Sequence, residues 1–183
     1  MEEESMRSTL RLAGLLAAAL STPALAQTGS TMASGTAPVA DTTFVKKAAI
    51  SDMYEIQASQ LAQTKATSAD VKSFAGRMIA DHTKTSTQLK AILASKSGLT
   101  APKTVDAEHR ALLSRLRAAS GAAFDRLYTQ QQLEAHQQAV MLFTSESQSG
   151  KDSDLKNFAG QTLPTLQQHL SMAQQLQKGG AAP

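Results

Sequence analysis

Residues 71–76 read Val71-Lys72-Ser73-Phe74-Ala75-Gly76, and 84 positions later residues 155–160 read Leu155-Lys156-Asn157-Phe158-Ala159-Gly160. In both copies the apolar residues recur at three- and four-residue spacing, which places them on one face of a helix. The same offset aligns Ile92 with Leu176, so the apolar registers also agree further along. The repeat indicates two related helical hairpins, in which each copy opens the second helix.

Capping residues and helix breakers divide the chain into four long helices and one short helix. The first is expected from the capping residues 41–43 to residue 65, and the second from Ser68 to residue 97. A short helix over 104–119 precedes long helices over 122–149 and 153–178. Short turns make each pair of long helices an antiparallel hairpin, whereas the long connection between the pairs fits either an up-down or a crossover bundle.

The composition agrees with a helical domain and excludes several functions. Aromatic residues make up 4% of the chain and Trp is absent, which disfavours a β-sandwich. The chain has no Cys, so disulfides, thiolate zinc sites and cysteine nucleophiles are excluded. Its formal net charge is +3, and its Lys and Arg residues do not cluster with aromatic residues. We therefore expect no binding of nucleic acid.

The N-terminal residues have the order of a cleavable secretory signal. Arg7 and Arg11 precede an apolar run over 12–20, and Pro23 leads to a predicted cleavage after Ala26. Residues 1–5 are acidic, so Met6 is the expected initiator. We predict a signal peptide over 1–26, a flexible leader over 27–40, the helical domain over 41–178 and a disordered tail over 179–183. No later apolar run reaches the length of about 18 residues that a membrane span needs, so we expect a periplasmic or secreted chain.

Each long helix carries one ionisable residue on the face that should point inward. In the second helix the apolar stripe passes through His82, and in the last two helices it passes through His136 and His169. In the first helix a stripe of small residues is interrupted by Glu55. At a rise of 1.5 Å per residue all four lie about 18–28 Å from the hairpin turns, near mid-helix. Three imidazoles and one carboxylate that converge there predict a site for zinc, iron or copper.

Neighbouring side chains are candidates for orienting these ligands. Asp81 lies beside His82, and Asp125 and Tyr128 precede His136 on the same helix. Buried histidines also bond to carboxylates, hydroxyls or backbone carbonyls without any metal. A polar network that fixes the helix register is therefore the alternative to a metal site.

The spacing of these residues excludes a classical di-iron carboxylate centre, which needs Glu-x-x-His on two helices. Ile79 and Leu166 occupy the positions three residues before His82 and His169. His109 lies on the short helix outside any apolar stripe, and we expect it in solvent. No nucleophile elbow, phosphate loop or pair of catalytic carboxylates is found, so the sequence does not indicate an enzyme.

Taken together, these elements resemble a family of secreted bacterial proteins catalogued as domain of unknown function 4142. The resemblance covers residues 42–176, and its matching elements are Phe44, Glu55, Leu61-Ala62, Val71, Phe74-Ala75, Met78, Asp81-His82, Phe124-Asp125, Tyr128, His136, Leu163-Pro164, Leu166 and His169. It implies an all-α, ferritin-like four-helix bundle made of two hairpins, and export of a protein labelled as outer-membrane or periplasmic. It implies no assigned enzymatic activity and supplies no ligand.

Three functions stay open. The first is an exported, non-enzymatic bundle with a role in envelope stress tolerance or metal handling. The second is a metalloprotein with a mononuclear site formed by Glu55, His82, His136 and His169. The third is an adaptor that binds an envelope protein through a helix face, such as that carrying Gln130-Gln131-Gln132 or Gln167-Gln168.

Overall fold

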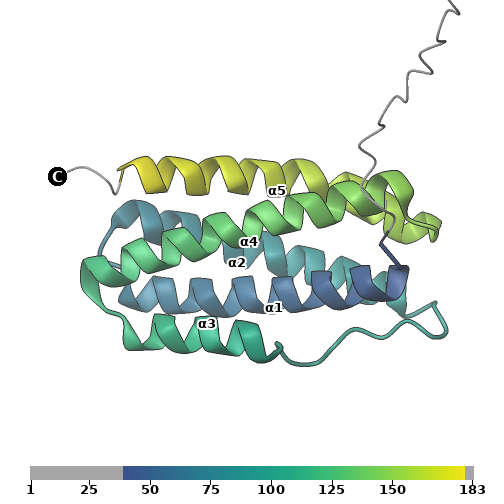
Figure 1. Cartoon of the computed structure of the whole chain (residues 1–183), viewed down its shortest axis with the longest axis horizontal. Helices are drawn as coiled ribbons and strands as arrows, with labels where there is room; N and C mark the ends of the chain where they lie inside the picture. The colour runs from purple at the N-terminus through teal and green to yellow at the C-terminus, as the bar shows by residue number, and fades with distance from the viewer. Residues whose placement is uncertain (1–38, 180–183) are drawn as a thin grey trace, which may run out of the picture. The chain divides into compact units, whose positions relative to one another are not determined.

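The computed structural model describes residues 39–179, and every regular element in that range is an α-helix (Figure 1). The helices are α1 (Asp41–Lys65), α2 (Ala69–Leu93), α3 (Ala107–Ala118), α4 (Gly121–Ser149) and α5 (Ser153–Gly179). The predicted all-α, ferritin-like bundle of two hairpins with a short extra helix is confirmed. The predicted signal peptide over 1–26, residues 27–38 of the predicted leader and residues 180–183 of the predicted tail lie outside the described residues. None of the described helices is both long and apolar enough to cross a membrane.

Local capping explains where the helices begin. Ser68 caps α2 as expected, because its hydroxyl accepts a hydrogen bond from a backbone N–H of the first turn. α1 begins earlier than expected, with Ala40 as the N-cap. Asp41 lies in the first turn, where its negative charge interacts favourably with the positive end of the helix dipole. α3 begins at residue 107 rather than 104, since the carboxylate of Asp106 accepts a 2.9 Å hydrogen bond from the backbone N–H of His109.

The two hairpins are joined as a crossover bundle. Asp125, in the first turns of α4, accepts hydrogen bonds of 3.1 and 3.0 Å from the backbone N–H groups of Thr67 and Ser68 in the α1–α2 turn. At the opposite end Lys96, which follows α2, forms a 2.7 Å ion pair with Asp154 at the start of α5. Hence α2 and α4 begin at the same end of the bundle and run parallel. The segment that links them, which consists of residues 94–106 and α3, carries the chain back along the bundle (Figure 1). α1 packs against α2, α3 and α4, and α5 packs against α2 and α4.

The core consists of two apolar clusters with polar residues between them. The cluster nearer the α1–α2 turn contains Phe74, Met78 and Tyr128. The other contains Phe44 and Phe143, whose rings meet edge to face at 5.1 Å. Between them lies a group that we call the polar layer, whose members are all buried: Asp52, Glu55, His82, Thr85, Gln132, His136 and His169. Because burying polar groups is unfavourable without partners, this layer is where a function is expected.

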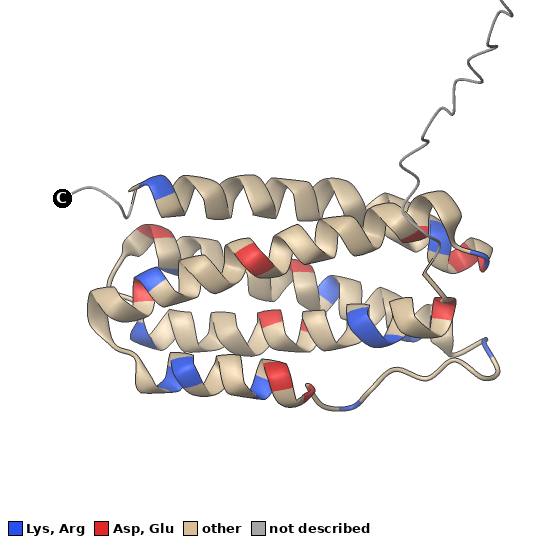
Figure 2. Ribbon diagram, in the orientation of Figure 1, with Lys and Arg blue, Asp and Glu red and all other residues tan. Residues whose placement is uncertain are grey.

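α5 differs from the other helices in two respects. Charged residues of both signs are interspersed over α1 to α4, whereas the middle of α5 carries none (Figure 2). α5 also contains Pro164, which lacks the N–H that would bond the carbonyl of Gly160. The hydroxyl of Thr162 donates a 2.8 Å hydrogen bond to the carbonyl of Phe158 in the same turn. This locally weakened stretch lies one turn before His169.

Candidate metal centre

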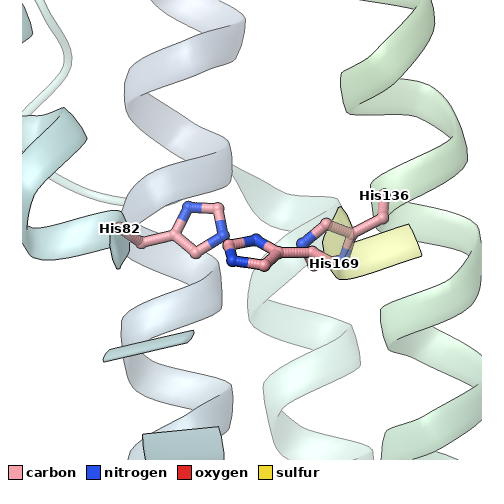
Figure 3. A group of neighbouring side chains, drawn as sticks. All are labelled: His82, His136 and His169. Atoms are coloured by element: carbon pink, nitrogen blue, oxygen red, sulfur yellow. The ribbon is translucent and has the colours of Figure 1, made fainter. Parts of the chain in front are cut away.

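Three imidazoles meet at the centre of the polar layer (Figure 3). His82 comes from α2, His136 from α4 and His169 from α5, and these residues are 1–2% exposed. One nitrogen of each ring lies within 4.8 Å of the other two. The ring centroids are 5.3 to 5.7 Å apart. The crossover bundle thus brings together residues from both hairpins.

The outer nitrogen of each ring is held by an acceptor. Nδ1 of His82 lies 2.8 Å from Oδ1 of Asp52, and Nδ1 of His136 lies 2.9 Å from the backbone carbonyl oxygen of Gln132. Nε2 of His169 lies 2.8 Å from Oδ2 of Asp81. Since a carbonyl or carboxylate oxygen only accepts, each neutral ring carries its proton on this outer nitrogen.

The inner nitrogen of each neutral ring therefore presents a lone pair. These atoms are Nε2 of His82, Nε2 of His136 and Nδ1 of His169, and each is buried without a hydrogen-bond partner among the described residues. When all three rings are neutral, three buried acceptors face one another without a donor, which is unfavourable. A cation among them removes that conflict, and outer hydrogen bonds of this kind are the usual support of metal-binding histidines.

The predicted orienting residues need correction. Asp81 does hold an imidazole, but that of His169 and not that of its chain neighbour His82, because adjacent residues on a helix point to different faces. Asp125 and Tyr128 do not hold His136, whose outer nitrogen is bonded to a backbone carbonyl. Asp125 caps the α1–α2 turn, and the hydroxyl of Tyr128 is 2.8 Å from that of Ser59.

Asp52 is the orienting residue that the sequence reasoning missed. It is 5% exposed, and its carboxylate also accepts hydrogen bonds of 2.9 and 3.2 Å from the hydroxyls of Thr85 and Ser86. The stripe of small residues that Glu55 interrupts in the first helix passes through Ser51. A second stripe, with the same three- and four-residue spacing, passes through Asp52. That second stripe was the signal that could have identified it.

Glu55 is buried in the polar layer beside this cluster. It is 1% exposed, and neither carboxylate oxygen has a hydrogen-bond partner among the described residues. Burial raises the pKa of Glu55 to about 7, although the charge of the nearby His82 acts in the opposite direction. Glu55 does not belong to the group of atoms that lie within 4.8 Å of one another. Its role as a fourth ligand therefore stays a prediction.

The protonation states favour a ligand role for two of the imidazoles. Burial, together with repulsion from His82, lowers the pKa of His136 to about 3. Burial also lowers the pKa of His169 to about 4, in spite of the opposing hydrogen bond to Asp81. Burial lowers the pKa of His82 as well, but Asp52 and the neighbouring carboxylates outweigh it and raise the value overall. At neutral pH the rings of His136 and His169 are thus neutral, as metal ligands must be.

The donor set fits an ion with nitrogen ligands. Three nitrogens bound at about 2.0–2.1 Å to one ion lie about 3.4 Å apart, so a small closing movement of the rings from their present separation would suffice. Imidazole suits zinc, copper and iron alike.

The remaining histidine, His109, lies outside the site. It is half-buried, whereas the sequence analysis expected it in solvent. Its Nδ1 lies 2.7 Å from Oδ1 of Asp106, and the centroid of its ring lies 5.0 Å from that of Tyr54.

The chain matches the family described as "Domain of unknown function (DUF4142)" over residues 24–176. The chain belongs to this family. The resemblance stated from the sequence is thereby confirmed, and no curated protein matches the chain.

Two solved structures share the fold. One is described as "CopM in the Cu(II)-bound form"; it is 18% identical, with a TM-score of 0.66, and the match covers 78% of this chain and 99% of that one. The other is described as "CopM in the Cu(I)-bound form", with the same identity and TM-score, and the match covers 79% and 99% of the two chains. At this identity the likeness establishes the helical fold of this DUF4142 protein.

Proposed function

We propose that this protein binds a copper ion through His82, His136 and His169, and that its role is metal handling in the cell envelope. The observation that carries the proposal is the set of three buried, unpartnered imidazole nitrogens that face one another. The copper-bound forms of CopM, which share the fold, support the choice of copper. The envelope location rests on the signal-like segment over 1–26, which lies outside the described residues.

The chemistry of the site also favours copper over zinc and iron. For a given set of nitrogen ligands, divalent copper binds most tightly of the first-row metals. A buried set of three imidazoles, with no thiolate anywhere in the chain, leaves nitrogen as the main donor. Glu55 is the candidate for a fourth, anionic ligand to the divalent ion.

The enclosure of the site indicates that the ion is held rather than used in turnover. Catalytic metal sites keep an open position for substrate, whereas closed sites hold the ion. Here the three histidine residues are 1–2% exposed, and two apolar clusters enclose the polar layer. We therefore place metal storage or sequestration ahead of catalysis.

Copper binding by purified protein without a histidine tag tests the proposal. We expect one copper per chain by elemental analysis after dialysis. Replacing His82, His136 and His169 together with Ala should abolish tight binding, as measured by competition with a chromophoric chelator. His109→Ala is the matched control and should bind as the unchanged protein does. Substoichiometric copper, or equal binding by the triple variant that circular dichroism shows to be folded, would overturn the proposal.

A second variant tests the supporting hydrogen bonds. Asp52→Asn keeps the size of the side chain but weakens its hold on His82, so copper affinity should fall by about 10- to 100-fold. Asp106→Asn alters the equivalent pair with His109, outside the site, and should leave copper affinity unchanged.

A further inference from the structure

A buried metal site needs a path by which the ion reaches it. A pocket of about 930 Å³ lies between the first turns of α2, the first half of α4 and the end of α5. These three helices are the ones that supply the imidazoles. We call it the α2–α4–α5 pocket.

The inner wall of this pocket adjoins the histidines. Phe74 lines the pocket, and its ring centroid lies 6.4 Å from that of His136. Leu133 and Met172 also line it, and each lies one helical turn from a histidine, namely His136 and His169. Phe74 is 2% exposed, so its ring separates the pocket from the cluster.

The charges around the pocket favour a cation. Asp70, Asp125 and Glu134 line it, against the single base Arg126. Figure 2 shows acidic and basic residues together at the end of the bundle where α2 and α4 begin, so the acidic excess belongs to the lining of the pocket and not to the whole end. The chain as a whole has a formal net charge of +3, so this acidic lining opposes the general trend. A concave surface of one sign raises the local concentration of ions of the other sign and their rate of association.

A second pocket provides the contrast. It has a volume of about 330 Å³ and is lined by other residues than the first pocket. One of them is Ser86, whose hydroxyl donates a hydrogen bond to Asp52, so this pocket also lies near the metal site. Its charged lining residues are Lys90 and Lys103. Two lysines at its mouth repel a metal cation, so this pocket is the poorer path.

We propose that metal ions reach the three imidazoles through the α2–α4–α5 pocket, with the ring of Phe74 as the movable barrier at its inner end. The inference rests on the proposed function, because it concerns delivery to the same site. A barrier of this kind sets the rates of uptake and release. The pocket wall away from Phe74 contacts none of the three histidines, so changes there should alter the rates without altering the equilibrium affinity.

Stopped-flow mixing of the metal-free protein with copper(II), followed by absorbance, tests this path. Phe74→Leu shrinks the barrier and should accelerate both uptake and release. Ser73→Trp adds bulk to the pocket wall and should slow both, while Ala101→Trp does the same in the second pocket and should leave both rates unchanged. In Ser73→Trp and Ala101→Trp, which do not alter a residue packed against a histidine ring, the dissociation constant should stay within about twofold of that of the unchanged protein.

A charge variant tests the electrostatic part. Glu134 is exposed, and among residues 39–179 its carboxylate accepts a hydrogen bond from Gln130 on the same helix, so Glu134→Gln should be well tolerated. It should lower the uptake rate by about two- to fivefold at low ionic strength and by less at high salt. Glu108→Gln on α3 removes the same charge from a residue that does not line the pocket and serves as the control.

The outcomes separate the two proposals. If the unchanged protein binds no copper, the proposed function fails first. If it binds copper, and Ser73→Trp and Glu134→Gln take it up as fast as the unchanged protein, the path is wrong although the site stands. Slower uptake by Ala101→Trp would assign the path to the second pocket and overturn the inference. Because Ser73 is exposed, its variant keeps the test valid even if Phe74→Leu does not fold.

Discussion

At the scale of single residues, the ionisable groups of the polar layer act on stability in opposite directions. The pKa of Glu55 is raised to about 7 in the folded chain. The native state therefore holds a proton that the unfolded state releases above its ordinary pKa of about 4.3. Stability from this group is present at low pH and is lost as the pH rises toward 7. The lowered pKa values of His136 and His169, about 3 and 4, have the reverse effect: their contribution is full above about pH 6.5 and is lost as the pH falls toward 4.

The substitution Glu55→Gln isolates the carboxylate from the histidines. Glutamine resembles the neutral acid, so we expect the metal-free variant to gain stability over the unchanged protein as the pH rises. The difference in the free energy of unfolding should be small near pH 4.5 and reach roughly 2–3 kcal/mol by pH 8. Urea unfolding in the presence of a chelator at several pH values measures it. A difference that does not change with pH would show that Glu55 is ionised in the folded chain.

At the scale of elements, the end of α4 is shaped around one glycine. Gly150 is the C-cap of α4, and its N–H donates to the carbonyl of Glu146 at 2.8 Å. A Cβ at this position would lie 2.6 Å from that carbonyl oxygen, closer than real contacts allow. Gly160, inside α5, is different, because a Cβ there would meet only Ser147, at 3.8 Å. A side chain is therefore excluded by steric contact at Gly150, whereas there is room for one at Gly160.

Alanine at these two glycines should have opposite effects. Gly150→Ala forces the backbone to shift and should lower the free energy of unfolding by about 1–3 kcal/mol. Gly160→Ala removes a flexible residue from a helix interior and should raise it by about 0.5–1 kcal/mol. Thermal denaturation of both variants beside the unchanged protein compares them. Stabilisation by both substitutions would contradict the steric account of the α4 terminus.

At the scale of the whole molecule, the crossover connection is what assembles the site. His82 lies in the first hairpin, whereas His136 and His169 lie in the second. Asp52 and Asp81, which hold His82 and His169, both come from the first hairpin. An ion bound by all three imidazoles would therefore join the two hairpins, and binding should stabilise the bundle as a unit.

Copper should raise the melting temperature of the whole domain. At a free concentration of 100 times the dissociation constant, the free energy of unfolding increases by about 2.7 kcal/mol. For a domain of this size the melting temperature then rises by about 5–10 °C. Calorimetry with copper(II), and again after removal of copper by a chelator, checks this. The increase in melting temperature should vanish in the triple histidine variant and persist in His109→Ala. An equal increase in both variants would show that copper bound elsewhere stabilises the domain.

Much of the fold could be predicted from the sequence, because helix periodicity and capping are local. The stripes through His82, His136 and His169 placed these residues on inward faces, and mid-helix position placed them at similar depth. The partners could not be predicted in the same way. Asp81 is next to His82 in the chain but bonds to His169, since the direction of a side chain depends on helix rotation and on the neighbouring helix. The unusual start of α1 at Asp41 likewise reflects backbone bonds to Ala40.

The sequence by itself determined that this protein is an all-helical bundle of two hairpins with histidines on inward faces, because apolar spacing and helix breakers act over a few residues. Only the tertiary structure decided that the hairpins join by a crossover, that Asp52 and Asp81 hold the outer nitrogens of His82 and His169, and that the inner nitrogens face one another. These features depend on which helices are neighbours and on their relative rotation, and residues 30 to 88 positions apart must be packed together before either is defined.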